Sequence, residues 1–61
     1  MLGKVRKAEV YQDAVGDWRW RAKAGNGEIV ADSGEGYVSR SHAVAMAEDV
    51  TGIPATVVES E

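Results

Sequence analysis

Four residues in the second half of the chain have the side-chain types of a hydrolytic site: Ser39, Ser41, His42 and Asp49. A serine nucleophile needs a base within hydrogen-bonding reach and a third group that orients the base. All four lie in a segment that is predicted to form one short helix, where adjacent residues such as Ser41 and His42 point about 100° apart. Adjacent carboxylates such as Glu48 and Asp49 do not face each other on a helix either. The sequence therefore predicts a protein that is not an enzyme.

A second group of residues is a weak candidate for binding an anionic ligand or a nucleic acid. It consists of one aromatic and three basic side chains, Tyr11, Arg19, Arg21 and Lys23. Basic side chains beside an aromatic ring are typical of nucleic-acid surfaces. Acidic residues fall on the same predicted sheet face, however, namely Glu9, Glu28 and Asp32. The interpretation favoured by this pattern is a solvated face with ion pairs and a cation–π contact between Tyr11 and Arg19.

Two glycines precede the predicted helix. Gly34 and Gly36 flank Glu35, and Ser39 follows three residues later. Backbone amides at a helix N-terminus attract phosphate, but this segment has neither a third glycine nor a lysine, and Glu35 would repel an anion. We interpret the glycines as the turn that leads from the sheet into a helix capped by Ser39.

The length of the chain limits how stable a single copy is. With 61 residues it forms one domain, residues 1–61, with residues 1–4 as a loose end. A domain of this size buries only about 60% of its unfolded surface, so a further source of stability is needed. Cysteine is absent and His42 is the single histidine, which leaves no disulfide framework and no zinc site. The sequence predicts no cofactor and no metal, and it favours a homodimer.

Charge and hydropathy restrict the partners and the location. The formal net charge is −3, which disfavours binding to nucleic acid through phosphate neutralisation. No segment approaches the run of about 20 apolar residues that spans a bilayer, and no apolar stretch follows the basic residues near Met1. We therefore expect a cytoplasmic protein without a membrane partner.

The strongest structural pattern lies in residues 17–24, where Trp18 and Trp20 alternate with basic residues. This period of two predicts a half-buried strand. Residues 5–12 alternate more weakly, with Val5, Lys7, Glu9 and Tyr11 on one side, and predict a second strand. A five-residue loop, 13–17, joins the two and places Val10 opposite Trp20 and Glu9 opposite Arg21.

A second hairpin is predicted at Asn26 and Gly27, a preferred pair for a type I′ turn. That turn places residues 28–33 as a third strand, with Ala24 opposite Ile29 and Ala22 opposite Ala31. Both turns put the same residues on the inner face. The resulting sheet core consists of Ala8, Val10, Trp18, Trp20, Ala22, Ala24, Ile29 and Ala31.

Residues 40–51 predict a helix, since apolar residues recur at the spacing of one helical face. These residues are Ala43, Met46, Ala47 and Val50. Gly52 suits the position after the helix, and Pro54 prevents its continuation.

The last segment, 55–59, is a β-branched run that predicts a final strand. Together with Ile53, the residues Val57 and Val58 carry much of the remaining apolar area. This strand pairs either with its own sheet or with that of a second copy. The small size of the core favours exchange between two copies through Ile53, Val57 and Val58.

The quoted strand and turn residues, especially residues 17–21, 26–31 and 33–37 with Ser39, resemble the YegP-like domains of unknown function. The resemblance covers residues 8–51. It implies a β-β-β-α-β unit in which two copies form one continuous sheet with exchanged C-terminal strands. It implies no activity.

The sequence thus predicts an α+β fold of β-β-β-α-β order, an antiparallel meander packed by one helix, in a strand-exchanged homodimer. The function favoured is a non-enzymatic binding module whose other partner is unknown. Two alternatives stay open: a nucleic-acid accessory role for the basic and aromatic face, and a small-ligand or enzymatic site at the dimer seam.

Overall fold

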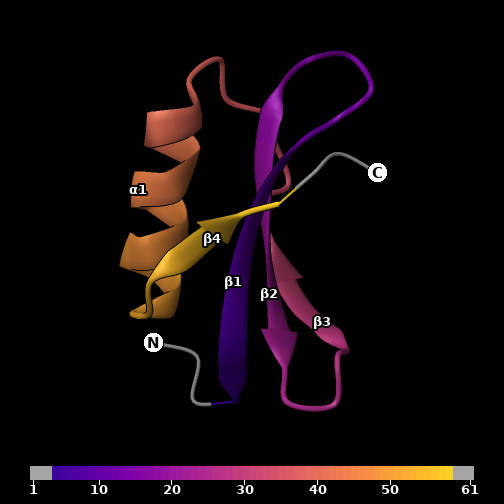
Figure 1. Ribbon diagram of the computed structural model, residues 1–61, viewed down its shortest axis with the longest axis vertical. Helices are drawn as coiled ribbons and strands as arrows, with labels where there is room; N and C mark the ends of the chain where they lie inside the picture. Colours follow the sequence, from indigo (N-terminus) through magenta and orange to yellow (C-terminus); the bar gives the residue numbers. More distant parts are fainter. Residues whose placement is uncertain (1–3, 59–61) are drawn as a thin grey trace.

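The computed structural model describes residues 4–58 and shows an α+β fold in the predicted order (Figure 1). Residues 1–3 of the predicted loose end and Glu59 of the predicted last strand lie outside the described residues. The elements are β1 (Val5–Gln12), β2 (Trp18–Ala24), β3 (Ile29–Asp32), α1 (Arg40–Thr51) and β4 (Ala55–Val57). The strands form one sheet of order β3-β2-β1-β4, and α1 packs against β1, β2 and β4.

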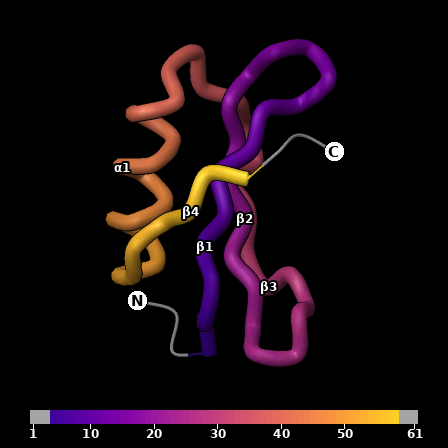
Figure 2. The backbone as a smooth tube through the Cα atoms, in the orientation of Figure 1, coloured from indigo at the N-terminus to yellow at the C-terminus, as the bar shows by residue number. Residues whose placement is uncertain are grey.

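The sheet is mixed. The first three strands form an antiparallel meander, whereas β4 runs parallel to β1 because α1 carries the chain back before β4 begins. The backbone trace shows the same path, with α1 beside the sheet and β3 at the opposite side (Figure 2). This arrangement places one face of the sheet against the helix, while no helix or strand of residues 4–58 covers the other face, called the open face below.

The β1–β2 hairpin has the predicted register. Val10 lies opposite Trp20 and Glu9 opposite Arg21. Asp13 organises the connecting loop, since its Oδ1 accepts hydrogen bonds from the amides of Val15 and Asp17, at 3.1 and 2.9 Å. An aspartate that bonds its own following backbone in this way replaces a backbone turn.

The β2–β3 turn differs from the predicted type I′ turn. The amide of Gly27 donates to the carbonyl of Ala24, and Gly27 alone in this turn has a positive φ, of 88°. A type I turn followed by a left-handed glycine makes a bulge, and the register shifts between Ala22 and Lys23. Ile29 consequently lies opposite Lys23 and is 56% exposed, so it is outside the core in which the sequence analysis placed it.

A second bulge lies near the start of β1, between Val5 and Lys7. The extra residue reverses the alternation on its N-terminal side. Val5 is therefore buried and belongs to the core, whereas strict alternation placed it on the outer face beside Lys7. Backbone irregularities of this kind leave no mark in a hydrophobic pattern of period two.

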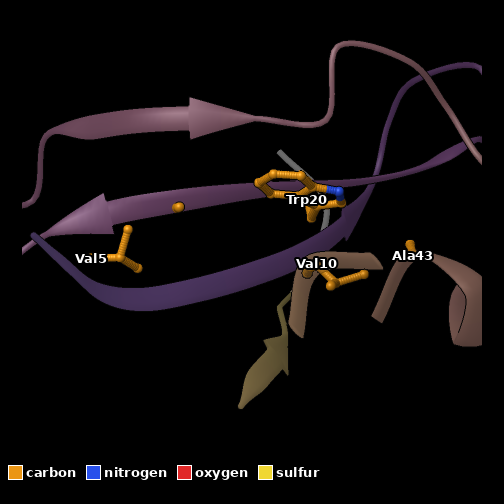
Figure 3. Close-up of a cluster of buried hydrophobic side chains, with 6 residues drawn as sticks. Val5, Val10, Trp20 and Ala43 are labelled. Carbon is orange, nitrogen blue, oxygen red and sulfur yellow. The ribbon is translucent and has the colours of Figure 1, made fainter. Parts of the chain in front are cut away.

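The core lies between the sheet and α1. Its buried hydrophobic members are Val5, Val10, Trp20 and Ala43, which Figure 3 labels, together with Ala8, Ala22 and Ala47. Trp18, Ala31 and Met46 are partly buried and pack against this cluster. The alanines allow α1 to approach the sheet closely, and the indole of Trp20 supplies the largest buried ring.

Val50 is 39% exposed, in contrast to its predicted place on the inner face of the helix. The buried line of α1 follows a spacing of four through Ala43, Ala47 and Thr51. Thr51 is fully buried because its hydroxyl donates to the carbonyl of Ala47 at 2.7 Å. A buried threonine therefore takes the place that the pattern assigned to a valine.

The helix begins and ends where the sequence predicts. Ser39 is the N-cap, and its hydroxyl accepts from the amide of His42 at 3.3 Å. Gly52 ends the helix in the left-handed conformation, with φ 75°, and its amide donates to the carbonyl of Glu48. Before the helix, Tyr37 exchanges two backbone hydrogen bonds with Trp18, which fixes the connection to the sheet.

The short strand β4 pairs with the middle of β1. Ala55 lies opposite Ala8 and Val57 opposite Val10, and the amide of Val58 donates to the carbonyl of Val10 at 2.8 Å. The structure contains one chain, in which β4 completes its own sheet. The predicted exchange of β4 with a second copy stays a prediction.

Candidate functional site

The open face of the sheet holds all four predicted ligand-binding residues, and Glu9 lies at their centre. Glu9 is only 7% exposed although it is charged. Its Oε1 accepts from Arg21 Nε at 2.8 Å and lies 3.2 Å from Lys23 Nζ, while its Oε2 lies 4.0 Å from Lys7 Nζ. The carboxylate of Glu9 is thus shared by three cations, Lys7 on β1 and Arg21 and Lys23 on β2.

This environment determines the ionisation of Glu9. The hydrogen bond from Arg21 and, to a lesser degree, the contact with Lys23 hold the pKa of the Glu9 carboxyl below its ordinary value of 4.5, while burial opposes them. A lowered pKa shows that the charged form is favoured in the folded chain. Glu9 is therefore a fixed anion near neutral pH, and it is unsuited to act as a general base.

Tyr11 contributes to the same cluster through Arg21. The guanidinium carbon of Arg21 lies 4.7 Å from the centre of the Tyr11 ring. The sequence predicted a contact between Arg19 and this ring, and Arg19 does lie directly opposite Tyr11. The diagonal neighbour makes the contact instead, because Arg19 turns toward the hairpin loop.

Arg19 pairs with Asp13, a residue that the sequence analysis did not single out. Arg19 Nε donates to Asp13 Oδ2 at 2.6 Å. The pair lowers the pKa of the Asp13 carboxyl and raises the pKa of Arg19. The position of Asp13 at the first residue of a five-residue hairpin loop is the sequence signal that could have identified it.

The arrangement is an ion-pair network on the open sheet face. Arg19, Arg21 and Lys23 each contact a carboxylate, so the positive charge of this face is largely compensated. Paired cations of this kind hold the two strands in register. These ion pairs leave less uncompensated positive charge available to bind a phosphate than the sequence alone suggests.

The serine and histidine side chains at the start of α1 serve the local structure. Ser39 Oγ caps the helix and also lies 2.9 Å from Ser41 Oγ. The His42 ring packs against Tyr37, with the ring centres 4.7 Å apart. Each side chain contacts neighbours within one short stretch of chain, so the geometry gives them a structural role.

The two glycines before α1 also have structural reasons. Gly34 has φ 71°, a conformation that other residues rarely adopt. A Cβ atom on Gly36 would lie 2.5 Å from Cβ of Asp17, so the backbone can pass close to the hairpin loop only with glycine there. These glycines position Ser39 at the end of the connection.

A small open hollow lies at the joint between α1 and β4. It is lined by Glu48, Gly52, Ile53 and Pro54. Glu48 closes one side of the joint, since its Oε2 accepts from the amide of Ala55 at 2.9 Å. The hollow thus coincides with the connection on which an exchange of β4 would depend.

Residues 4–58 contain neither a cluster of metal-binding side chains nor a membrane-spanning helix. No group of three or more histidine, cysteine, aspartate or glutamate side chains in this part of the chain is arranged to hold a metal ion. No helix in it is long and apolar enough to cross a bilayer.

Comparison with known proteins gives a consistent result. A family model described as a domain of unknown function, DUF1508, matches residues 13–52. A UPF0339 protein of Neisseria meningitidis serogroup B is 50% identical over 46 residues, which cover 70% of this chain and 80% of the relative. One of Agrobacterium fabrum is 43% identical over 44 residues, 72% of this chain and 69% of the relative. No solved structure gives a significant match. These findings confirm the YegP-like resemblance.

Proposed function

The chain belongs to the DUF1508 family of domains of unknown function, and from its own geometry we propose that it is a small non-enzymatic binding module that works as a homodimer. In this proposal β4 of each copy pairs with β1 of the other. The names of its relatives state no activity, so the proposal rests on the surface and the packing of this chain. A cytoplasmic location stays a prediction from the sequence.

The observation that carries the proposal is the way in which β4 is attached. Among residues 4–58, three residues of β4 pair with β1, and residues 52–54, with Gly52 and Pro54, connect β4 to the helix. A terminal strand at the sheet edge on a short connection is an element that two copies exchange at little cost, because each copy makes the same contacts in either arrangement.

The packing of a single chain supports the proposal that a second copy binds to it. Val57 is 43% exposed although it lies opposite the fully buried Val10, and Val50 on the adjacent helix is 39% exposed. The indole Nε1 of Trp20 is buried without a hydrogen-bond partner among the described residues, which costs about 1–3 kcal/mol. A dimer would cover apolar surface that a single small core leaves in water.

The experiment is a measurement of solution mass by sedimentation over a range of concentrations. We expect a mass of two chains for the native protein. Val57→Asp should shift the equilibrium toward one chain, because it places a charge on apolar surface that the second copy covers. Val38→Asp is the matched control, since Val38 is 94% exposed and lies outside β4. A native mass of one chain at all concentrations would contradict the proposal.

The nucleic-acid role is the alternative with the next most support. Tyr11 and the cations around Glu9 occupy one open face, and three cations share that single carboxylate. Against it stand the ion pairs of Arg19, Arg21 and Lys23 and the net charge of −3. A site for a small ligand at the dimer seam has no contact among the described residues that favours it.

A further inference from the structure

The bulge near the start of β1 places two cations opposite a third. Val5 pairs with Ala24, whereas Lys7, two positions further along β1, pairs with Lys23, the residue directly before Ala24. Two residues of β1, Arg6 and Lys7, therefore lie opposite the single residue Lys23. Both are exposed, although Val5 before them is buried, so neither side chain belongs to the core. We call Arg6, Lys7 and Lys23 the bulge cations.

The side chain of Arg6 extends toward the β2–β3 turn. A Cβ atom on Gly25, the residue that directly follows β2, would lie 3.6 Å from Cγ of Arg6. Lys23 precedes Gly25 by two residues. The start of β1 and the β2–β3 turn lie at the same end of the sheet (Figure 1), so the bulge cations gather there.

The charge of the bulge cations is poorly compensated. Lys23 Nζ lies 3.2 Å from Oε1 of Glu9, and Lys7 Nζ lies 4.0 Å from Oε2 of the same residue. Among residues 4–58, no carboxylate forms an ion pair with Arg6. Glu9 also pairs with Arg21. Three cations thus share one carboxylate, which leaves a surplus of two positive charges at this end of the sheet.

This arrangement is a poor choice for the stability of the sheet alone. Lys7 and Lys23 lie directly opposite each other, and like charges in that position are destabilising. The side chain of Lys7 is 62% exposed, so an ion in solution can reach its ammonium group. Residues that break a local rule of stability are expected at functional sites. An anion bound between the cations would turn their repulsion into attraction.

We propose that the bulge cations bind a phosphate group with two negative charges, either as free phosphate or as the end group of a small phosphate ester. Such a group carries about −1.5 to −2 charges at pH 7, which matches the surplus of two. The guanidinium of Arg6 is suited to donate two parallel hydrogen bonds to phosphate oxygens. Lys7 and Lys23 contribute as point charges.

The site differs from the surface considered above for nucleic acid. Arg19 pairs with Asp13 and Arg21 with Glu9, so a long polyanion meets the charge surplus at the bulge and compensated cations further along β2. The site does not depend on the exchange of β4 either. That strand pairs with residues 8–10 of β1, and the bulge precedes them.

The test is a titration of the isotope-labelled native protein at constant ionic strength. The probes are inorganic phosphate, glycerol 3-phosphate and, as the control, dimethyl phosphate, which carries one negative charge. We expect both doubly charged probes to shift the amide resonances of Arg6, Lys7 and Lys23. Dimethyl phosphate should bind at least about tenfold more weakly, because one charge is missing. Equal binding of dimethyl phosphate, or resonances of the bulge cations that do not shift, would overturn the proposal.

Two variants locate the binding. Arg6→Gln and Lys7→Gln each remove one bulge cation, and each should weaken the binding of inorganic phosphate at least about fivefold. Both positions are exposed, so thermal unfolding should show that the variants fold. Arg40→Gln is the matched control, since it removes a cation from α1 and should leave binding unchanged. Undiminished binding by both bulge variants, or an equal loss in Arg40→Gln, contradicts the assignment.

A short thymidine oligonucleotide without a terminal phosphate separates this site from a nucleic-acid surface. Each of its phosphates is a diester with one charge, so we expect the response of Arg6 to be no larger than with dimethyl phosphate. Shifts with this oligonucleotide that are strongest at Tyr11 and Arg19, together with binding tighter than that of inorganic phosphate, would assign the open face to nucleic acid and overturn the proposal.

Discussion

At the scale of single residues, Glu9 is the side chain with the most consequence. It is a nearly buried anion in the middle strand pair, and it contacts cations on both β1 and β2. A buried charge is tolerated only where partners replace its hydration. Because Arg21 also packs against Tyr11, the loss of Glu9 would weaken two contacts at once.

We predict that Glu9→Gln lowers the free energy of unfolding at pH 7 by about 1–3 kcal/mol, since it removes the negative charge that Lys7, Arg21 and Lys23 share. The pKa of Glu9 is below its ordinary value in the folded chain. Its contribution is therefore present above the unfolded pKa of about 4.5 and is lost as the pH falls through the lower folded value.

Denaturant unfolding from pH 7 to pH 3 checks this prediction. The difference in stability between the native protein and Glu9→Gln should shrink as the pH falls below about 4.5. Glu35→Gln changes a carboxyl in the exposed turn before the helix and should leave the native curve unchanged. A difference that stays constant over this range would show that the charge of Glu9 does not stabilise the fold.

The sequence predicted the facing pair of Glu9 and Arg21 because it depends only on loop length and on the period of two. It did not predict which cation lies over Tyr11, nor the role of Asp13. These contacts depend on side-chain rotamers and on loop hydrogen bonds, and both are set by the packing around them.

At the scale of elements, glycines determine how closely connecting segments approach their neighbours. Gly36 passes so close to Asp17 that a Cβ atom would lie 2.5 Å from that side chain. Gly25, in the β2–β3 turn, has room by contrast, since a Cβ atom there would lie 3.6 Å from Cγ of Arg6. The two positions look alike in the sequence and differ only in what surrounds them.

We predict that Gly36→Ala lowers the free energy of unfolding by about 1–3 kcal/mol, because the added methyl group forces the connection away from the hairpin loop. Gly25→Ala is the matched control and should be nearly neutral, since no positive φ is recorded for Gly25. Thermal unfolding of both variants is the measurement. Equal effects would show that the close approach at Gly36 carries no strain.

The bounds of β1 and α1 were predictable, because Ser39, Gly52 and the period of the apolar residues mark them clearly. The two bulges were not. They moved Val5 into the core and Ile29 out of it, since one extra residue reverses the side on which the residues N-terminal to it lie. A buried threonine at the end of α1 likewise displaced Val50.

At the scale of the whole molecule, the sheet has two different edges. The β4 edge is short and attached through residues 52–54, and it is the edge through which we propose that two copies exchange strands. The β3 edge is acidic at both ends and apolar in the centre. An exchanged dimer of this kind would carry a β3 edge at each end of one long sheet.

The measurement that tests strand exchange most directly is a disulfide across the β1–β4 pair. The native chain has no cysteine, and Ala8 lies opposite Ala55. In the double variant Ala8→Cys and Ala55→Cys, paired strands bring the two sulfur atoms within bonding reach. The single variants are the controls and should run as one chain. After oxidation, a denaturing gel without reductant should show the double variant at the mass of two chains, because β4 pairs with β1 of the other copy. A band at the mass of one chain, with the bridge formed inside it, would contradict the exchange.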